Sequence, residues 1–200
     1  MGDFSAALIA GGHSRRMGRD KAFLTWNGRP LWEHQLEKLS ALGPRQLFLS
    51  CRTEQGFPPM DGVEPVPDIQ PDCGPLGGIA GCLAKCQAPR LLVLGIDLPG
   101  LPAALLKELL SAPGGRGAVV ERREASGAWF EPLAALYPKT MLPLAMEQIA
   151  RGELALQAWI RRGVLAGQLS VRPAPPEAAD WFLNANRPED LRPAPEERLD

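Results

Sequence analysis

Short apolar runs alternate with helix-like segments through the first half of the chain. Residues 4–10 form an apolar run that ends in glycines, which predicts a buried strand. After Pro30, the apolar side chains recur at helical spacing until a Gly-Pro pair ends the segment at residues 43–44. The other predicted strands cover residues 46–50, 63–66 and 90–95, and the other predicted helices cover residues 76–86 and 103–111. This alternation predicts an α/β fold, with a Rossmann-like, mostly parallel twisted sheet and helices on both of its faces.

The second half of the chain is less regular. The predicted strands there cover residues 118–122, 129–137 and 169–172, and the predicted helices cover residues 140–151 and 154–162. The last residues are charged and contain proline, which is typical of a loosely ordered end. We therefore predict one domain over residues 1–191 and a loose tail over residues 192–200.

Charge and length exclude several classes of protein. The 200 residues carry 22 Lys and Arg against 23 Asp and Glu, so a dedicated nucleic-acid binder is not expected. No apolar run approaches the roughly 20 residues that span a bilayer, and the first residues do not resemble a secretory signal. We expect a cytoplasmic protein that binds neither nucleic acid nor membrane.

Residues 10–21, AGGHSRRMGRDK, follow the first predicted strand directly and combine glycine with positive charge. Gly11 and Gly12 let backbone N–H groups approach a ligand, and successive N–H groups in such a turn bind anions. Arg16 and Lys21 add charge against phosphate oxygens. The string is neither GxxxxGK[ST] nor GxGxxG, and its composition alone would also suit a solvated surface turn.

Asp97, Asp68 and Asp72 follow predicted strands, and ligands bind beyond the carboxyl ends of the strands in open α/β sheets. Asp97 follows the predicted strand 90–95, and an Asp at the carboxyl end of a parallel strand is well suited to hold magnesium against phosphate. The alternative role for Asp97 is to cap the helix that follows Pro102. Asp68 and Asp72 lie in a segment rich in proline and glycine, where either could serve turn chemistry alone.

The cysteines and histidines do not indicate another chemistry. The four cysteines do not form the paired spacing of a zinc site, and Cys82 and Cys86 share one face of a predicted helix, so we expect core thiols. His13 and His34 are the two histidines, and no Ser-His-Asp or Cys-His set is suggested.

Four separated motifs resemble those of the molybdenum cofactor guanylyltransferases, within the sugar-nucleotidyltransferase-like superfamily. Residues 9–21 read IAGGHSRRMGRDK against the family's L-A-G-G-x-S-x-R-M-G-x-D-K, with Ile9 for Leu as the one departure. GPLGG at 74–78 matches G-P-L-x-G, and DLP at 97–99 matches D-x-P. FLNANRPEDL at 182–191 resembles F-x-N-x-N-T-P-E-D-L. Between residues 112 and 180 the likeness rests mainly on PLAALY at 132–137.

The resemblance implies transfer of GMP from GTP to the terminal phosphate of molybdopterin or molybdenum cofactor, with release of pyrophosphate. It implies Mg²⁺ as cofactor, held by Asp97, and transient contacts with proteins that deliver or receive the molybdenum cofactor. Asp68 is preferred to Asp72, because the family's Asp at this point precedes the G-P-L-x-G segment. The implied catalytic residues are Arg16, Lys21 and Asp97; the implied nucleotide-binding residues are Ile9, Ala10, Gly11, Gly12, Lys21, Asp68 and Asp97; and the implied acceptor-binding residues are Asn184 and Asn186.

Two features bear on the alternatives. The family often presents a nucleotide-contacting Asn after the second strand, whereas this chain reads Ser50-Cys51-Arg52. Gly11-Gly12 leaves room for a purine because neither residue has a Cβ, and the related cytidylyltransferases tend to carry Ala-Gly, so guanine is predicted over cytosine. The alternatives are a cytidylyl- or sugar-phosphate nucleotidyltransferase on the same fold, or a protein that binds GTP without turnover.

Overall fold

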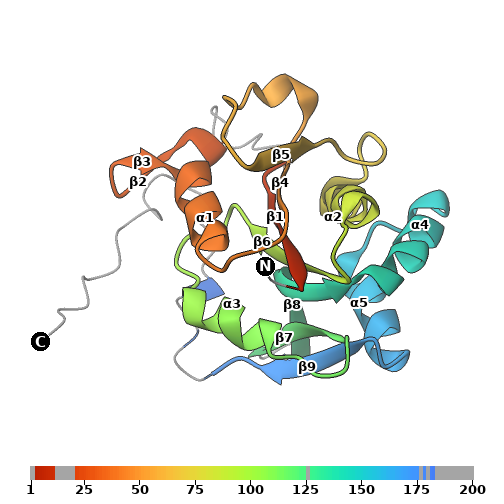
Figure 1. Cartoon of the computed structure of the whole chain (residues 1–200). Coiled ribbons are helices and arrows are strands. Elements are labelled where there is room, and N and C mark those ends of the chain that lie inside the picture. Colours follow the sequence, from red (N-terminus) through yellow and green to blue (C-terminus); the bar gives the residue numbers. More distant parts are fainter. Residues whose placement is uncertain (1–2, 12–20, 125–126, 176–177, 179–180, 183–200) are drawn as a thin grey trace, which may run out of the picture.

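A seven-stranded sheet runs through the computed structural model, which describes residues 3–11, 21–124, 127–175, 178 and 181–182. Its strand order is β5-β4-β1-β6-β8-β7-β9 (Figure 1). A separate two-stranded hairpin follows the first loop. The strands are β1 Phe4–Ile9, β2 Thr25–Trp26, β3 Arg29–Pro30, β4 Leu47–Ser50, β5 Val63–Val66, β6 Arg90–Gly95, β7 Gly117–Glu124, β8 Gly127–Pro138 and β9 Leu169–Pro173.

Helices connect these strands and cover both faces of the sheet. The α-helices are α1 Leu31–Ser40, α2 Gly74–Lys85, α3 Ala103–Leu110, α4 Leu142–Ala150 and α5 Leu156–Leu165. The short 3-10 turns η1 Lys21–Phe23, η2 Thr53–Gln55 and η3 Lys139–Met141 lie between these elements. Within the described part of the chain, none of the helices has the length and apolar character that crossing a membrane requires.

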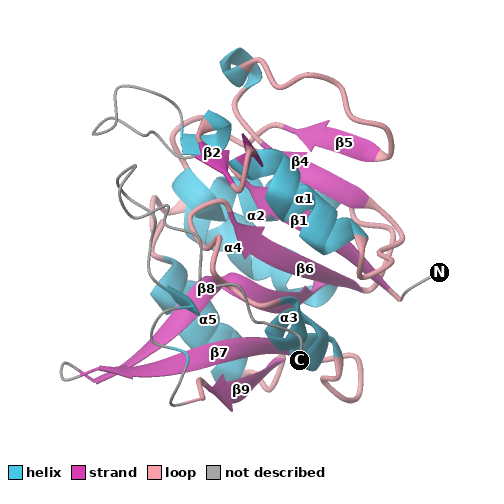
Figure 2. Ribbon diagram, turned by 90° about the vertical axis from the view of Figure 1, so that its left-hand side faces the viewer, coloured by secondary structure: helices cyan, strands magenta, loops and turns pink. Residues whose placement is uncertain are grey.

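The sheet has a parallel half and a mixed half. β5, β4, β1 and β6 are parallel, with Ala6 opposite both Leu47 and Leu92. β8 runs antiparallel to β6 and to β7, while β9 returns parallel to β7. The β7–β8 hairpin extends beyond the body of the sheet (Figure 2). The prediction of a mostly parallel sheet with helices on both faces is confirmed, and the antiparallel β8 is an addition to it.

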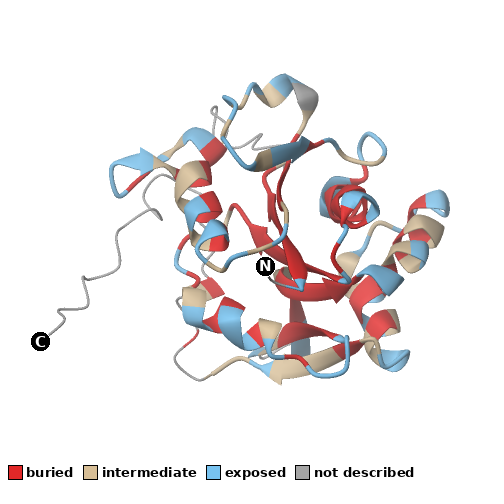
Figure 3. Cartoon of the chain, in the orientation of Figure 1, coloured by how far each residue is buried: buried red, intermediate tan, exposed pale blue. Residues whose placement is uncertain are grey.

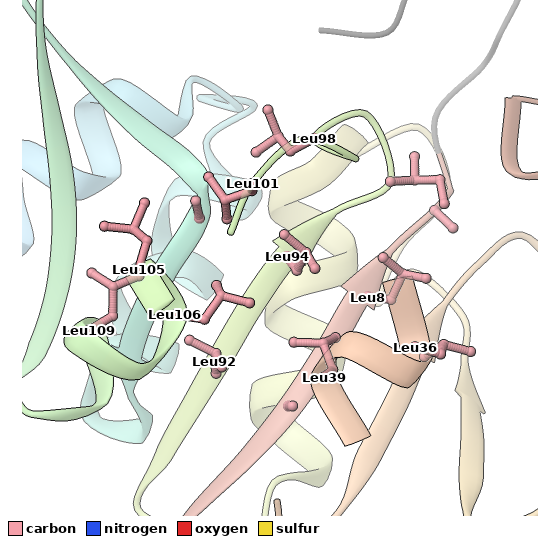
Figure 4. Packing of buried hydrophobic residues seen from close by; sticks show 14 of the residues in the cluster. Leu8, Leu36, Leu39, Leu92, Leu94, Leu98, Leu101, Leu105, Leu106 and Leu109 are labelled. Atoms are coloured by element: carbon pink, nitrogen blue, oxygen red, sulfur yellow. The ribbon is translucent and has the colours of Figure 1, made fainter. Parts of the chain in front are cut away.

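The core consists of two apolar layers separated by the sheet. Leucines of α1 and α3 pack on one face, against Leu8 of β1 and Leu92 and Leu94 of β6 (Figure 4). Helices α2, α4 and α5 pack on the other face, around Phe48, Tyr137 and Trp159. The central strands are buried on both sides, which is why they read as continuous apolar runs rather than alternating ones (Figure 3).

The predicted element boundaries differ from the structure in places that have local causes. Helix α2 begins at Gly74, two residues before the predicted start, because Pro75 suits a first helical turn and Gly74 adopts the left-handed conformation at φ 56°. The β2–β3 hairpin and the 3-10 turns are too short to give a periodic signal. The predicted tail, residues 192–200, lies outside the described residues.

Candidate nucleotide-binding site

The carboxyl ends of the parallel strands meet at one edge of the sheet. The Ala10 N–H donates to the Ser50 carbonyl at 2.9 Å, and the Ile96 N–H donates to the Ile9 carbonyl at 3.1 Å, so the loops after β4 and β6 flank the loop after β1. The loops after β1, β4 and β6, which lie far apart in the sequence, therefore begin side by side. This edge is where open α/β sheets bind ligands.

A pocket of about 410 Å³ opens beside the end of β1. Its walls include Ile9 at the end of β1, Gly11 from the first loop, which follows that strand, Asp68 and Asp72 from the segment after β5, and the N-terminal residues of α2. A volume in this range suits a small-molecule ligand. The structure thus brings three of the predicted nucleotide-binding residues, Ile9, Gly11 and Asp68, to one cavity.

Glycines allow Asp68 to lie close to the backbone of two elements. A Cβ added at Gly11 would lie 3.6 Å from Asp68 Oδ1, and one at Gly78 of α2 would lie 3.2 Å from the same atom and too close to the Ser50 hydroxyl. At Gly77 a Cβ would lie 2.7 Å from the Cys73 Cβ. Residues 77–78 of the GPLGG segment are therefore small because α2 packs directly on the Asp68 loop.

Asp97 occupies a largely buried position after β6. Burial raises the pKa of its carboxyl, while the nearby positive charge of Lys21 and its own backbone N–H act in the opposite direction. Its Oδ1 atom is buried and accepts no hydrogen bond from the described part of the chain. A Cβ at Gly95 would lie 2.5 Å from that oxygen, so glycine leaves the space that the carboxylate uses. A desolvated oxygen without a donor is suited to a cation, because burial without a partner is costly.

Two side chains of α1 fix the loop that carries Asp97. The fully buried Gln35 donates through Nε2 to the carbonyls of Gly95 at 3.1 Å and Leu98 at 3.0 Å. Lys38 donates through Nζ to the carbonyls of Pro99 at 3.0 Å and Leu101 at 2.8 Å. Burial lowers the pKa of Lys38 to about 8. Gln35 and Lys38 are three residues apart, so both side chains lie on one face of α1. The prediction of this helix used only its apolar residues and therefore did not identify these two polar ones.

Sequence reasoning did not identify Glu131, which lies on β8 next to the Asp97 site. Burial and then the negative charge of Asp97 raise the pKa of its carboxyl, while Arg122 and the Leu133 N–H lower it. Arg122 Nη1 lies 3.4 Å from Glu131 Oε2, and the guanidinium carbon is 5.2 Å from the centre of the Phe182 ring. The available signal was an ionisable residue directly before the apolar segment 132–137.

Several predicted residues lie outside the described part of the chain, namely Gly12, Arg16, Asn184 and Asn186. The expected core role of the cysteines is confirmed, because Cys51, Cys73, Cys82 and Cys86 are all buried. Gln55 and Arg52, which contact the first loop, were also not predicted as site residues; both belong to a turn without periodic signal.

Comparison of the sequence with known proteins gives a consistent result. Residues 6–169 match the model of the MobA-like NTP transferase domain. The chain is 38% identical over 190 residues to a probable molybdenum cofactor guanylyltransferase of Opitutus terrae, covering 93% of this chain and 92% of the relative. It is 34% identical to a probable molybdenum cofactor guanylyltransferase of Deinococcus radiodurans, covering 94% and 91%.

Solved structures share the fold at low sequence identity. A molybdopterin-guanine dinucleotide biosynthesis protein A from Archaeoglobus fulgidus superposes with a TM-score of 0.72 at 22% identity, over 94% of both chains. The 2-C-methyl-D-erythritol 4-phosphate cytidylyltransferase of Thermus thermophilus gives a TM-score of 0.71 at 17% identity, over 93% of this chain and 94% of that one. These structures support the arrangement of the sheet and its helices.

Proposed function

The chain belongs to the MobA-like NTP transferase family, and on that basis we infer that it is a molybdenum cofactor guanylyltransferase. It transfers GMP from GTP to the terminal phosphate of molybdopterin or molybdenum cofactor, releases pyrophosphate and forms the molybdopterin guanine dinucleotide cofactor. The structural observation that supports this activity best is the buried Asp97 Oδ1, which accepts no hydrogen bond from the described residues and has the charge of Lys21 close by, at the strand edge that also holds the pocket.

Nucleotidyltransferases of this family generally use a divalent metal, and we propose Mg²⁺ held by Asp97. The orphaned Oδ1 fits such an ion, because Mg²⁺ prefers oxygen ligands and is commonly bound through one or two carboxylates together with substrate phosphates. When bound, the ion would neutralise charge on the phosphate oxygens. The positive charge of Lys21 would partly offset the negative charge of Asp97, so that the site repels a triphosphate less.

The reaction needs positioning more than proton transfer. An oxygen of the acceptor's terminal phosphate forms a bond to the α-phosphorus of GTP as the bond from that phosphorus to the bridging oxygen breaks, and pyrophosphate leaves with the electron pair. A phosphate monoester has a second pKa near 6, so at neutral pH most of the acceptor is already dianionic and needs no general base. We propose that Lys21 and Arg16 stabilise the charge that develops on the leaving group.

The remaining assignments are proposals that the resemblance supports. Ile9, Ala10, Gly11 and Gly12, together with Asp68, would hold the nucleotide, and Asn184 and Asn186 would place the pterin through amide groups that both donate and accept. A cytoplasmic location and transient contacts with proteins that deliver or receive the cofactor are proposed on the same basis.

Product analysis tests the function directly. Purified protein is supplied with molybdopterin, Mg²⁺ and each NTP in turn, and pyrophosphate and the pterin product are measured. We expect GMP to be incorporated in preference to CMP when GTP and CTP are equal. Predominant CMP incorporation would identify a cytidylyltransferase instead, and GTP binding without pyrophosphate release would identify a non-catalytic GTP-binding protein.

A further inference from the structure

Arg52 lies in the wall of the pocket, two residues after the end of β4. Its side chain is 23% exposed, and the same wall includes Gly11, Glu54 and Asp68. Among the described residues that line this pocket, Arg52 carries the positive charge and the others are acidic, apolar or glycine. This described part of the wall therefore combines the guanidinium with carboxylates, which suits a ligand with both acceptors and donors.

The turn that carries Arg52 is fixed to the first loop. Arg52 Nη1 donates to the Gly11 carbonyl at 3.4 Å, and its Nε lies 3.1 Å from Glu54 Oε1. The Arg52 backbone N–H donates to Gln55 Oε1 at 2.6 Å, and Gln55 Nε2 donates to the Ala10 carbonyl at 3.0 Å. These contacts hold the guanidinium at the pocket wall before any ligand binds, which reduces the entropy lost when its planar fork forms hydrogen bonds.

The fork of Arg52 matches one edge of one base. Guanine presents two neighbouring acceptors, O6 and N7, and an arginine binds that pair through two parallel N–H groups. Adenine presents an amino donor beside N7, so the same arginine meets a donor where it needs an acceptor. A base with this acceptor pair, placed beside Gly11, would meet the guanidinium where the structure holds it.

We propose that Arg52 is a specificity-determining residue that reads the O6/N7 edge of guanine. The proposal deepens the proposed guanylyl transfer and rests on it for the identity of the nucleotide. Glu54 acts on the base indirectly, as the residue that positions the guanidinium.

Removal of a single atom from the ligand tests the contact. Binding of GTP, 7-deaza-GTP and ATP is measured by calorimetry without acceptor, for the wild-type protein and for Arg52→Ala. The wild type should bind 7-deaza-GTP at least about tenfold more weakly than GTP, the scale of a good bidentate base contact. Arg52→Ala should bind GTP and 7-deaza-GTP about equally, because the partner of N7 is gone, and its preference for GTP over ATP should fall by a similar factor.

The ratio between the two guanine nucleotides separates recognition from loop shape. Arg52→Ala also removes the donor to the Gly11 carbonyl, and a loosened loop would weaken both nucleotides by the same factor. A variant that keeps the wild-type ratio would show that Arg52 shapes the loop only, which overturns the proposal. Arg151→Ala, directly after the end of α4, removes an exposed arginine; it is the control and should retain the wild-type values.

Failure of this inference differs from failure of the proposed function. A wild-type protein that releases pyrophosphate from GTP, and that binds 7-deaza-GTP as well as GTP, overturns the role of Arg52 alone. A protein that binds GTP with the expected ratio and releases no pyrophosphate in the presence of molybdopterin and Mg²⁺ overturns the transferase activity, while the role of Arg52 in reading guanine stands.

Discussion

The loops that follow β1 and β6 are both fixed by side chains that donate to their carbonyls, but the donors come from different places. Arg52 and Gln55, from a half-exposed turn, hold the carbonyls of Gly11 and Ala10. The loop after β6 is held from within the core by the fully buried Gln35, and from the side of α1 by the partly buried Lys38.

The difference separates two tasks. A carboxylate that holds a metal must keep its position to within a fraction of an ångström, and a donor fixed in a packed core provides that. A base-binding wall made from a surface turn can change its side chains without disturbing the core. We therefore expect substitutions of Gln35 and Lys38 to affect the catalytic rate and the stability. Substitutions of the residues that contact the loop after β1 should affect the choice of nucleotide.

The largest effect is expected at Asp97 itself. Asp97→Asn should lower the rate of pyrophosphate release by at least about 100-fold, the scale of removing one electrostatic stabiliser. The amide is nearly isosteric, so the thermal unfolding midpoint should stay close to that of the wild type. Magnesium-dependent turnover near the wild-type rate would remove Asp97 from the site.

The donors of the two loops can be compared by matched substitutions. Gln35→Leu should lower the free energy of unfolding by about 2 kcal/mol, because two buried carbonyls lose their donor. Gln55→Leu should cost less, about 1 kcal/mol, because one carbonyl loses this donor instead of two and Gln55 itself is only partly buried. Denaturant titration of both variants measures the difference, and equal losses would contradict the contrast drawn between the loops.

Lys21 connects the two regions, because it follows the first loop while its charge acts on Asp97. Lys21→Ala should lower kcat/KM for GTP by about tenfold, which corresponds to about 1.4 kcal/mol. The loss should shrink in high salt as far as solvent screens the charge. Lys107→Ala on α3 removes an exposed lysine and serves as the control; an unchanged profile for Lys21→Ala would place that residue outside the site.

Lys38, which holds the loop after β6, should make the free energy of unfolding depend on pH in the alkaline range. Its pKa in the folded protein is about 8, below the ordinary value of 10.5, so the unfolded chain binds more protons between these values. The charged amine therefore costs stability below pH 8, and this cost is relieved as the pH rises from 8 towards 10.5. The unfolding free energy of the wild type minus that of Lys38→Met should rise over this window. A difference that is constant or falls would contradict a partly buried Lys38 whose pKa is lowered in the folded protein.

The smallest effect is expected at Gly11. A Cβ there would lie 3.6 Å from Asp68 Oδ1 and 3.9 Å from the Cys51 Cα, in ordinary contact, so Gly11→Ala should fold normally. It narrows the space beside the pocket, and the preference for GTP over CTP should fall by about threefold, because one added methyl group has a modest effect on discrimination. Competition between equal GTP and CTP measures this ratio. An increase would show that the purine does not occupy this space.

Periodicity was sufficient for the large elements and insufficient for the short ones. The apolar runs of β1 and β6 predicted buried parallel strands because both of their faces are covered. The position of β8 could not be predicted, since an antiparallel strand between β6 and β7 has the same apolar pattern as a parallel one. Turn η2 is too short for periodicity, and so is hairpin β2–β3, whose local signal is the Asn27-Gly28 turn with both residues at positive φ.

Candidate site residues could be predicted where a motif stands next to a strand end. Asp97, Lys21, Gly11 and Asp68 were predicted in this way; their roles stay predictions, and the structure brings Lys21 close to Asp97 and Asp68 close to Gly11. The supporting side chains were not, because their role depends on partners about 40 to 60 residues away, such as the Ala10 carbonyl for Gln55 or the Gly95 carbonyl for Gln35. Nothing local in the sequence distinguishes such a glutamine from a surface one.

The buried thiols have a consequence for the redox behaviour of the enzyme. Burial and the negative charge of Asp68 raise the pKa values of Cys51 and Cys82. The thiolate is the form that attacks disulfides and is oxidised, so the raised pKa values keep these buried sulfurs in the less reactive thiol form. Peroxide or an oxidised thiol would therefore react with these buried sulfurs only after the packing around them had opened.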